Sequence, residues 1–204
     1  MFDVKKEVII AFRENKYPIL ISAILFIASL ILGYLFEPML YSYFNPVVED
    51  LTNKVQTGVI KLTFDVIFFN NLNIILRMFV FGVIFCISGV ILSFNGFFVG
   101  YFAAASGDLP RVLLLTVPHG IFEFSSCILS CAAGFVLFHS LYLFFKTLLI
   151  QENNSVLNKL KISVDGCWDK FKQAFILFII SVILMAIAGL IEVYLTVYIA
   201  QFFI

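Results

Sequence analysis

The chain has 204 residues, of which 62% are apolar and 13% are charged, against roughly 45–50% and 25% in ordinary soluble domains. This composition excludes an ordinary soluble domain. The 13 basic and 13 acidic residues give zero net charge, so we expect no basic surface for phosphates and no nucleic-acid partner. The four cysteines include no CxxC pair and predict neither a disulfide framework nor a thiolate metal site.

Four stretches of the chain contain no Asp, Glu, Lys or Arg, and they cover 17–36, 78–107, 124–145 and 173–191. A helix of about 20 apolar residues crosses the ~30 Å hydrocarbon core of a bilayer. The sequence therefore predicts an all-α, polytopic membrane protein, with one membrane domain over 1–204. We expect a multi-pass protein of the cell membrane.

The first third of the chain is expected to contain one span and one surface helix. A cytoplasmic arm covers 1–16, and a first span over 17–36 ends at Glu37-Pro38. The outer connection 37–71 carries an amphipathic helix over 46–66, because its apolar residues recur at intervals of three and four. These apolar residues are Val47, Leu51, Val55, Val59, Leu62 and Val66.

Four further spans are expected after this connection. They cover 72–94, 95–117, 118–145 and 171–203, with a cytoplasmic loop at 146–170 between the last two. Asn95-Gly96 favours a tight turn and should end the second span. Ser106–Arg111 interrupts the third, which we expect to be a broken helix. Pro118 begins the fourth, in the first turn of the helix, where its missing N–H costs little.

The distribution of Lys and Arg predicts the orientation. Four basic residues lie in the N-terminal arm and five at 146–172, whereas the connection 37–77 has three. The positive-inside rule places the arm and the inner loop in the cytoplasm. Both can lie there only if an even number of crossings separates them. We therefore expect five crossings, with the N-terminus cytoplasmic and the C-terminus outside.

Two stripes of small residues have the spacing of helix–helix contacts in membranes. They are Gly96-xxx-Gly100-xxx-Ala104 and Ser126-xxx-Ser130-xxx-Gly134. Small residues let helix backbones approach closely, which is how apolar helices associate in lipid. The stripes indicate either packing within one chain or a face for self-association. The sequence leaves both open, and we expect a homodimer.

Ionisable residues within the apolar runs predict a buried polar cluster. Helical rise counted from the inner lysines Lys146 and Lys172 places Glu123 and Glu192 near the outer hydrocarbon boundary. His119 lies one turn from Glu123, and Arg77 begins a span at the same boundary, so four residues are expected at one level: Arg77, His119, Glu123 and Glu192. His119 and Glu123 are four apart and share a helix face. Such groups are costly in lipid unless paired.

Three interpretations of this cluster stay open: a structural network compensated by Arg77, a proton or ion pathway, and a metal site. One His with two carboxylates is a permissible ligand set but lacks the HExxH spacing. We assign no metal and expect no cofactor. No GxSxG, P-loop or GxGxxG motif is present, so we assign no catalytic residue and expect no enzyme. Asp108 and Arg111 are expected to form a local salt bridge, and His139 a helix-packing hydrogen bond.

Four motifs occur in a fixed order: Asn70-Asn71-Leu72, Asn95-Gly96-Phe97-Phe98-Val99-Gly100, Pro118-His119-Gly120-Ile121-Phe122-Glu123 and Ala188-Gly189-Leu190-Ile191-Glu192. Together they make the chain resemble the stage II sporulation protein M family of integral membrane proteins, from about residue 65 to 195. The resemblance implies a membrane protein with five helices and no established catalytic activity. It also implies a role similar to a membrane anchor that gathers other proteins. We single out Asn95, Gly96, Gly100, Pro118 and Gly120 as its helix-break and packing motif.

Two functions follow as hypotheses. The first is a non-enzymatic, self-associating scaffold for envelope proteins or membrane lipids. The alternative is a small transporter or channel that uses the broken third span and the cluster of His119, Glu123 and Glu192. Co-purified partners would support the first hypothesis, and flux across a membrane the second.

Overall fold

The computed structural model describes residues 3–58, 63–84, 86–150 and 155–200. Within these residues every secondary-structure element is a helix, and no strand is present. Five helical segments are long and apolar enough to cross a membrane, namely Lys16–Asp50, Phe64–Val83, Ile87–Ala105, Leu109–Ile150 and Val156–Thr196. The predicted fold class, an all-α polytopic membrane protein with five candidate spans, is confirmed.

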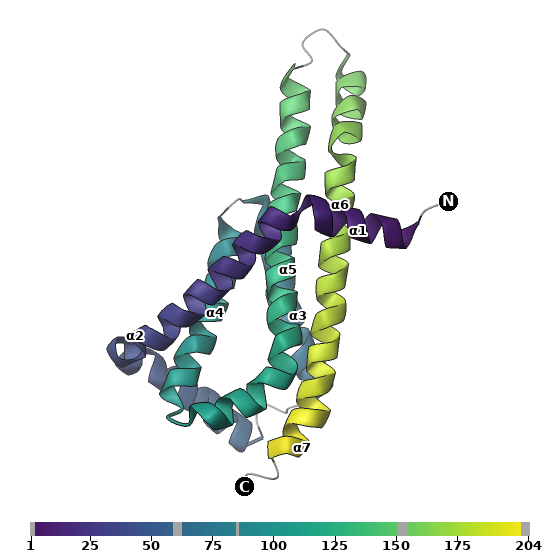
Figure 1. The fold of residues 1–204 in the computed structure, drawn as a ribbon. Coiled ribbons are helices and arrows are strands. Elements are labelled where there is room, and N and C mark those ends of the chain that lie inside the picture. The colour runs from purple at the N-terminus through teal and green to yellow at the C-terminus, as the bar shows by residue number, and fades with distance from the viewer. Residues whose placement is uncertain (1–2, 59–62, 85, 151–154, 201–204) are drawn as a thin grey trace.

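The helices follow in chain order as α1 (Val4–Glu14), α2 (Lys16–Gln56), α3 (Phe64–Val80), the short 3₁₀ segment η1 (Phe81–Val83), α4 (Ile87–Ala105), α5 (Leu109–Ile150), α6 (Val156–Ile191), the π-helical segment η2 (Glu192–Thr196) and α7 (Val197–Ala200). Successive spans alternate in direction along the bundle, and α1 lies across it (Figure 1).

Buried serines join α5 to α6. Ser126 Oγ donates to the Ser181 carbonyl at 2.7 Å, and Ser181 Oγ donates back to the Ser126 carbonyl at 2.9 Å. Further along the pair, Ser140 Oγ donates to the Cys167 carbonyl at 3.4 Å. The partner number falls as the α5 number rises, so the two helices form an antiparallel hairpin. Hydroxyls that donate to backbone carbonyls fix this register in surroundings where no water competes.

The first span differs from its predicted boundaries. It does not end at Glu37-Pro38, because α2 continues to Gln56 with Pro38 and Pro46 inside it. Figure 1 shows that α2 bends near its lower end, as proline in a helix commonly causes. The predicted separate helix over 46–66 is thus divided between the end of α2 and the start of α3, and its positions 59–62 lie outside the described residues.

The breaks between the next spans also differ from the prediction. Asn95-Gly96 does not end a helix but lies inside α4, and the chain turns earlier, between η1 and α4. The insert at Ser106–Arg111 is not a break within a span. It contains the turn between α4 and α5, where Gly107 has φ 67°, a conformation that glycine adopts readily. Pro118 lies within α5, which begins at Leu109.

The small-residue stripes pack within the chain. A Cβ on Gly96 would lie 2.8 Å from the Phe26 carbonyl oxygen, so α4 lies against the backbone of α2. On α5, Ser130 Oγ donates to the Ile75 carbonyl at 2.6 Å, and a Cβ on Gly134 would lie 2.8 Å from the Met78 carbonyl oxygen. Both stripes therefore serve packing in one molecule, the first of the two interpretations that the sequence left open.

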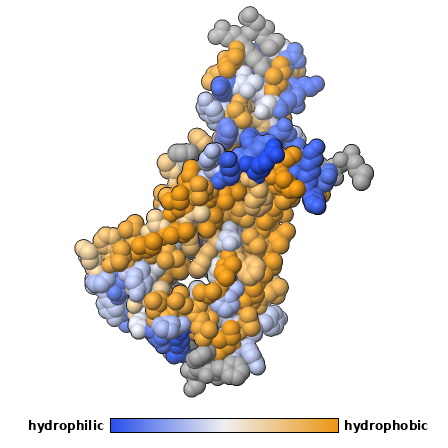
Figure 2. Space-filling model, in the orientation of Figure 1, coloured by the Kyte–Doolittle hydropathy of each residue, from blue (hydrophilic) through white to orange (hydrophobic). Residues whose placement is uncertain are grey.

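A polar contact fixes α1 to α6 where the chain enters the bundle. Lys170 Nζ and Gln173 Nε2 donate to Glu14 Oε2 at 3.0 and 2.8 Å, and Asn15 Nδ2 donates to Gln173 Oε1 at 2.8 Å. Gln173, and after it Lys170, hold the pKa of the Glu14 carboxyl below its ordinary value. Charged side chains of this region form the hydrophilic band that separates the apolar bundle from the upper part of the molecule (Figure 2).

The hairpin of α5 and α6 is longer than a membrane is thick. Figure 1 shows that α5 bends near its start, away from α6, as Pro118 inside the helix commonly causes. The part of α5 after Pro118 has 32 residues, or about 48 Å at 1.5 Å per residue, and α6 has 36, or about 54 Å. The hydrocarbon core is only ~30 Å thick. Figure 1 shows the two helices continuing together well beyond α1. We call the part of the hairpin beyond α1, residues 143–150 and 155–167, the hairpin arm.

Candidate functional site: a His–Glu–Glu cluster between α5 and η2

Two residues of the site come from one face of α5. His119 and Glu123 are four residues apart and lie one turn from each other on this helix. Gly120, between them, is buried, and a Cβ there would lie 3.0 Å from the ring of Phe124. The Pro-His-Gly-xx-Glu motif therefore places an imidazole and a carboxylate on one face of α5. The glycine between them occupies a position where a larger residue would contact Phe124 closely.

The third residue comes from the end of the last span. α6 passes into η2 at Glu192, and the π-helical turn extends to Thr196. One potential ligand atom from each of His119, Glu123 and Glu192 lies within 4.8 Å of the other two, and all three residues are half-buried. His119 Nδ1 lies 3.1 Å from Thr196 Oγ1. Single-turn π-helices occur frequently at functional sites, and this one presents Glu192 and Thr196 to α5.

Arg77 is not joined to these three residues. Its Nε donates to Asn73 Oδ1 at 3.1 Å, its side chain is exposed, and within the described residues it forms no salt bridge. The neighbouring Met78 packs against Gly134, which is about 11 residues, or roughly 16 Å, along α5 from Glu123. The predicted cluster thus brings together three of its four residues, and Arg77 lies at another depth.

The described part of the chain places no Lys or Arg in a salt bridge with Glu123 or Glu192. Carboxylates at such a position are costly unless another charge, a proton or hydrogen bonds compensate them. The arrangement can therefore bind a cation, or its two carboxyl groups can share a proton.

The other polar residues singled out in the sequence lie apart from this site. Asp108 Oδ1 accepts from the Arg111 backbone N–H at 3.2 Å. It thus caps the start of α5, whereas a salt bridge between the two side chains does not occur among the described residues. His139 is exposed and stands beside Tyr142, with ring centroids 6.4 Å apart. The packing hydrogen bond expected for His139 is likewise absent from the described contacts.

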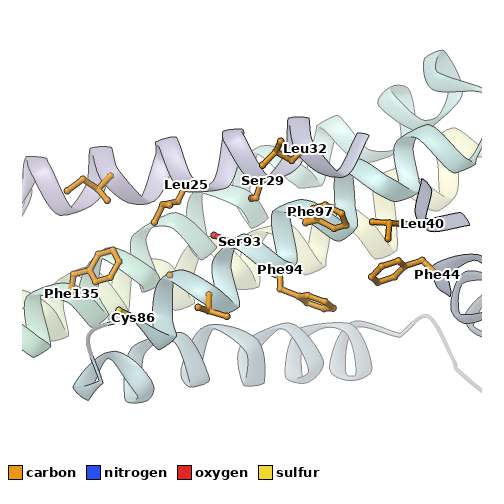
Figure 3. Close-up of a pocket in the computed structure, with 13 residues that line it drawn as sticks. Leu25, Ser29, Leu32, Leu40, Phe44, Cys86, Ser93, Phe94, Phe97 and Phe135 are labelled. Atoms are coloured by element: carbon orange, nitrogen blue, oxygen red, sulfur yellow. The ribbon is translucent and has the colours of Figure 1, made fainter. Parts of the chain in front are cut away.

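An apolar groove between α2 and α4 had no signal in the sequence analysis. Its volume is about 790 Å³, and Leu25, Leu32, Phe94 and Phe97 are among the residues that line it (Figure 3). The backbones of the two helices approach closely at Gly33, Gly96 and Gly100. The groove forms along candidate membrane spans, so lipid chains or another membrane helix are the groups that can fill it.

Comparisons with known proteins identify a family and two relatives that share most of this chain, including the region of the site. The model of the stage II sporulation protein M family matches residues 22–197, a range that contains the whole cluster. An uncharacterised protein of Methanocaldococcus jannaschii is 32% identical over 192 residues, which cover 92% of this chain and 98% of that protein. A second uncharacterised protein of this archaeon is 27% identical over 201 residues, 94% of this chain and 86% of that protein. No solved structure matches. The chain therefore belongs to the stage II sporulation protein M family.

Proposed function

We propose that the protein is a non-enzymatic membrane scaffold that holds envelope proteins, including further copies of itself, through the hairpin arm. The observation that carries the proposal is the length of α5 and α6, which exceeds the bilayer thickness by several turns. A helical pair that serves only to cross the membrane has no need of this extension. The arm lies at the same end of the bundle as α1 (Figure 1), and we propose that this end is cytoplasmic.

Exposed apolar side chains on the arm support a docking role. Leu149 is 77% exposed, Val156 73% and Leu157 80%. Apolar side chains that stand clear of the bilayer lose water contact when a partner covers them. Because both small-residue stripes are already used within the chain, self-association would have to use another surface, and the arm is the one we propose. Membrane lipids would fill the groove between α2 and α4.

Photo-crosslinking in native membranes tests the scaffold proposal. A photoreactive residue at Leu149 or at Leu157 is expected to give a discrete crosslinked protein band. A band at twice the mass of the 23.1 kDa chain would identify a second copy, and any other discrete band another envelope protein. The matched control is Ile179, a 54% exposed residue of the spanning part of α6, where lipid should react instead. If the two arm positions give no more protein adduct than Ile179, the scaffold proposal is wrong.

A second candidate function is transport of a proton or a cation, which the cluster of His119, Glu123 and Glu192 favours. The predicted break in the third span does not support it, because Ser106–Arg111 contains the turn between α4 and α5. In proteoliposomes, wild-type flux should be abolished by Glu123→Gln and unchanged by Glu49→Gln, which alters an exposed carboxylate on α2. Wild-type vesicles without flux would exclude this function for the ions assayed.

A further inference from the structure

We propose that His119, Glu123 and Glu192 form a membrane-embedded binding site for a divalent transition-metal ion of the Zn²⁺ class. This inference goes beyond the scaffold function and does not depend on it. The observation behind it is the convergence of one imidazole and two carboxylates, with ligand atoms within 4.8 Å of one another, from elements about 70 residues apart in the chain. Ions held by three such groups lie about 2 Å from each ligand atom, so the separation needs only small side-chain rotations.

The negative charge of the two carboxylates favours a cation as the ligand of this site. The site brings two carboxylates together, and within the described residues neither forms a salt bridge with Lys or Arg. Two ionised carboxylates at this separation repel each other strongly where water is scarce. A divalent ion neutralises both at once. A shared proton is the competing arrangement, and it neutralises only one of them.

The ligand types select the kind of ion. Mg²⁺ and Ca²⁺ prefer sites built from oxygen alone, whereas an imidazole suits Zn²⁺ and its neighbours in the transition series. Three protein ligands also leave room for water or another group at a fourth position, as in open zinc sites. The site is therefore assigned to a transition metal and not to an alkaline-earth ion.

Thr196 is not one of the three proposed ligands, but its hydroxyl orients the ring of His119. Its hydroxyl lies 3.1 Å from His119 Nδ1, which leaves Nε2 as the ring nitrogen that can coordinate. A partner at the second ring nitrogen is the usual way in which proteins orient a metal-binding histidine. The π-helical turn carries Glu192 and Thr196 at its two ends, so one short segment supplies both a ligand and the group that orients the histidine.

The position of the site allows ions to enter from one face of the membrane. Glu192 is about 20 residues along the last span from Lys172, roughly 30 Å, which is close to the thickness of the hydrocarbon core. Lys172 lies at the end that holds α1, 3.9 Å from Glu7. The three ligands thus lie near the opposite face, and their partial exposure leaves them accessible.

Metal binding can be measured on the full chain in lipid nanodiscs. After incubation with Zn²⁺ and desalting, the wild type should retain about one Zn²⁺ per chain, and Co²⁺ in its place should give a visible absorption band. Glu123→Gln, Glu192→Gln and His119→Gln should each weaken Zn²⁺ binding at least tenfold. Thr196→Val keeps all three ligands and should weaken binding by about tenfold. Mg²⁺ at the same concentration should not compete.

Control variants separate this site from general metal uptake. His139→Gln removes the other histidine and Glu49→Gln an exposed carboxylate, and both should bind Zn²⁺ like the wild type. Size-exclusion profiles identify any variant that fails to fold, in which case Thr196→Val decides. The proposal is overturned if the wild type retains no Zn²⁺, a result that would favour the shared proton, or if the ligand variants bind it as tightly as the wild type.

Discussion

Gly100→Ala is expected to lower the free energy of unfolding by about 3 kcal/mol, the upper part of the usual range for overpacking. A Cβ at Gly100 would lie 2.8 Å from the carbonyl carbon of Leu30 and 3.0 Å from the backbone nitrogen of Tyr34. Side chains can rotate away from such a clash, but the backbone of α2 cannot. The two helices would have to separate, and they would then lose the neighbouring contact at Gly96.

Gly89→Ala on the same helix is the matched control. There a Cβ would meet only side chains, at 3.5 Å from Phe135 and 3.6 Å from Leu25, which is ordinary contact. Alanine also has the higher helix propensity, by about 1 kcal/mol, so this variant should be as stable as the wild type or more stable. Thermal unfolding in the same detergent compares the two variants. Equal transition temperatures would contradict the close crossing of α2 and α4.

The number of spans could be predicted from the sequence, but several of their ends could not. Long uncharged runs identify helices in lipid because every backbone group there needs an internal partner. The same requirement explains why Asn95-Gly96 failed as a turn signal. In soluble proteins an Asn-Gly dipeptide often forms a turn. In α4 the helix continues through it, and Gly96 allows close contact with α2. Pro38 and Pro118 likewise lie inside helices, as neighbouring helices permit in membranes.

Three of the four residues of the candidate site could be predicted, because their positions follow from regular helical geometry. The spacing of His119 and Glu123 depends only on helical geometry, and Glu192 was placed by counting residues along an uninterrupted helix. Arg77 was misplaced because α3 begins at Phe64, eight residues before the start predicted for that span, which amounts to about 12 Å along the helix. Neither the π-helical turn nor the contact of Thr196 with His119 had a signal in the sequence, since both depend on how α6 ends against α5.

Cysteines at positions 54 and 159 are expected to label in opposite ways in intact cells. Lys54→Cys lies near the end of α2, and Lys159→Cys lies on the hairpin arm. If the N-terminus is cytoplasmic, an impermeant maleimide should label position 54 from outside and reach position 159 only after permeabilisation. The background chain should carry alanine at its native cysteines, which are Cys86, Cys127, Cys131 and Cys167. Without an introduced cysteine, this background should stay unlabelled.

The structure makes this labelling experiment decisive about orientation. The hairpin arm and α1 lie at one end of the bundle, and α2 leads from α1 to the other end (Figure 1). A candidate span therefore separates positions 54 and 159, so in a membrane they should face different compartments. The abundance of lysine near α1 and on the hairpin arm predicts, by the positive-inside rule, that this end is cytoplasmic. The opposite labelling pattern would invert the protein, place the arm outside the cell and direct the search for its partners there.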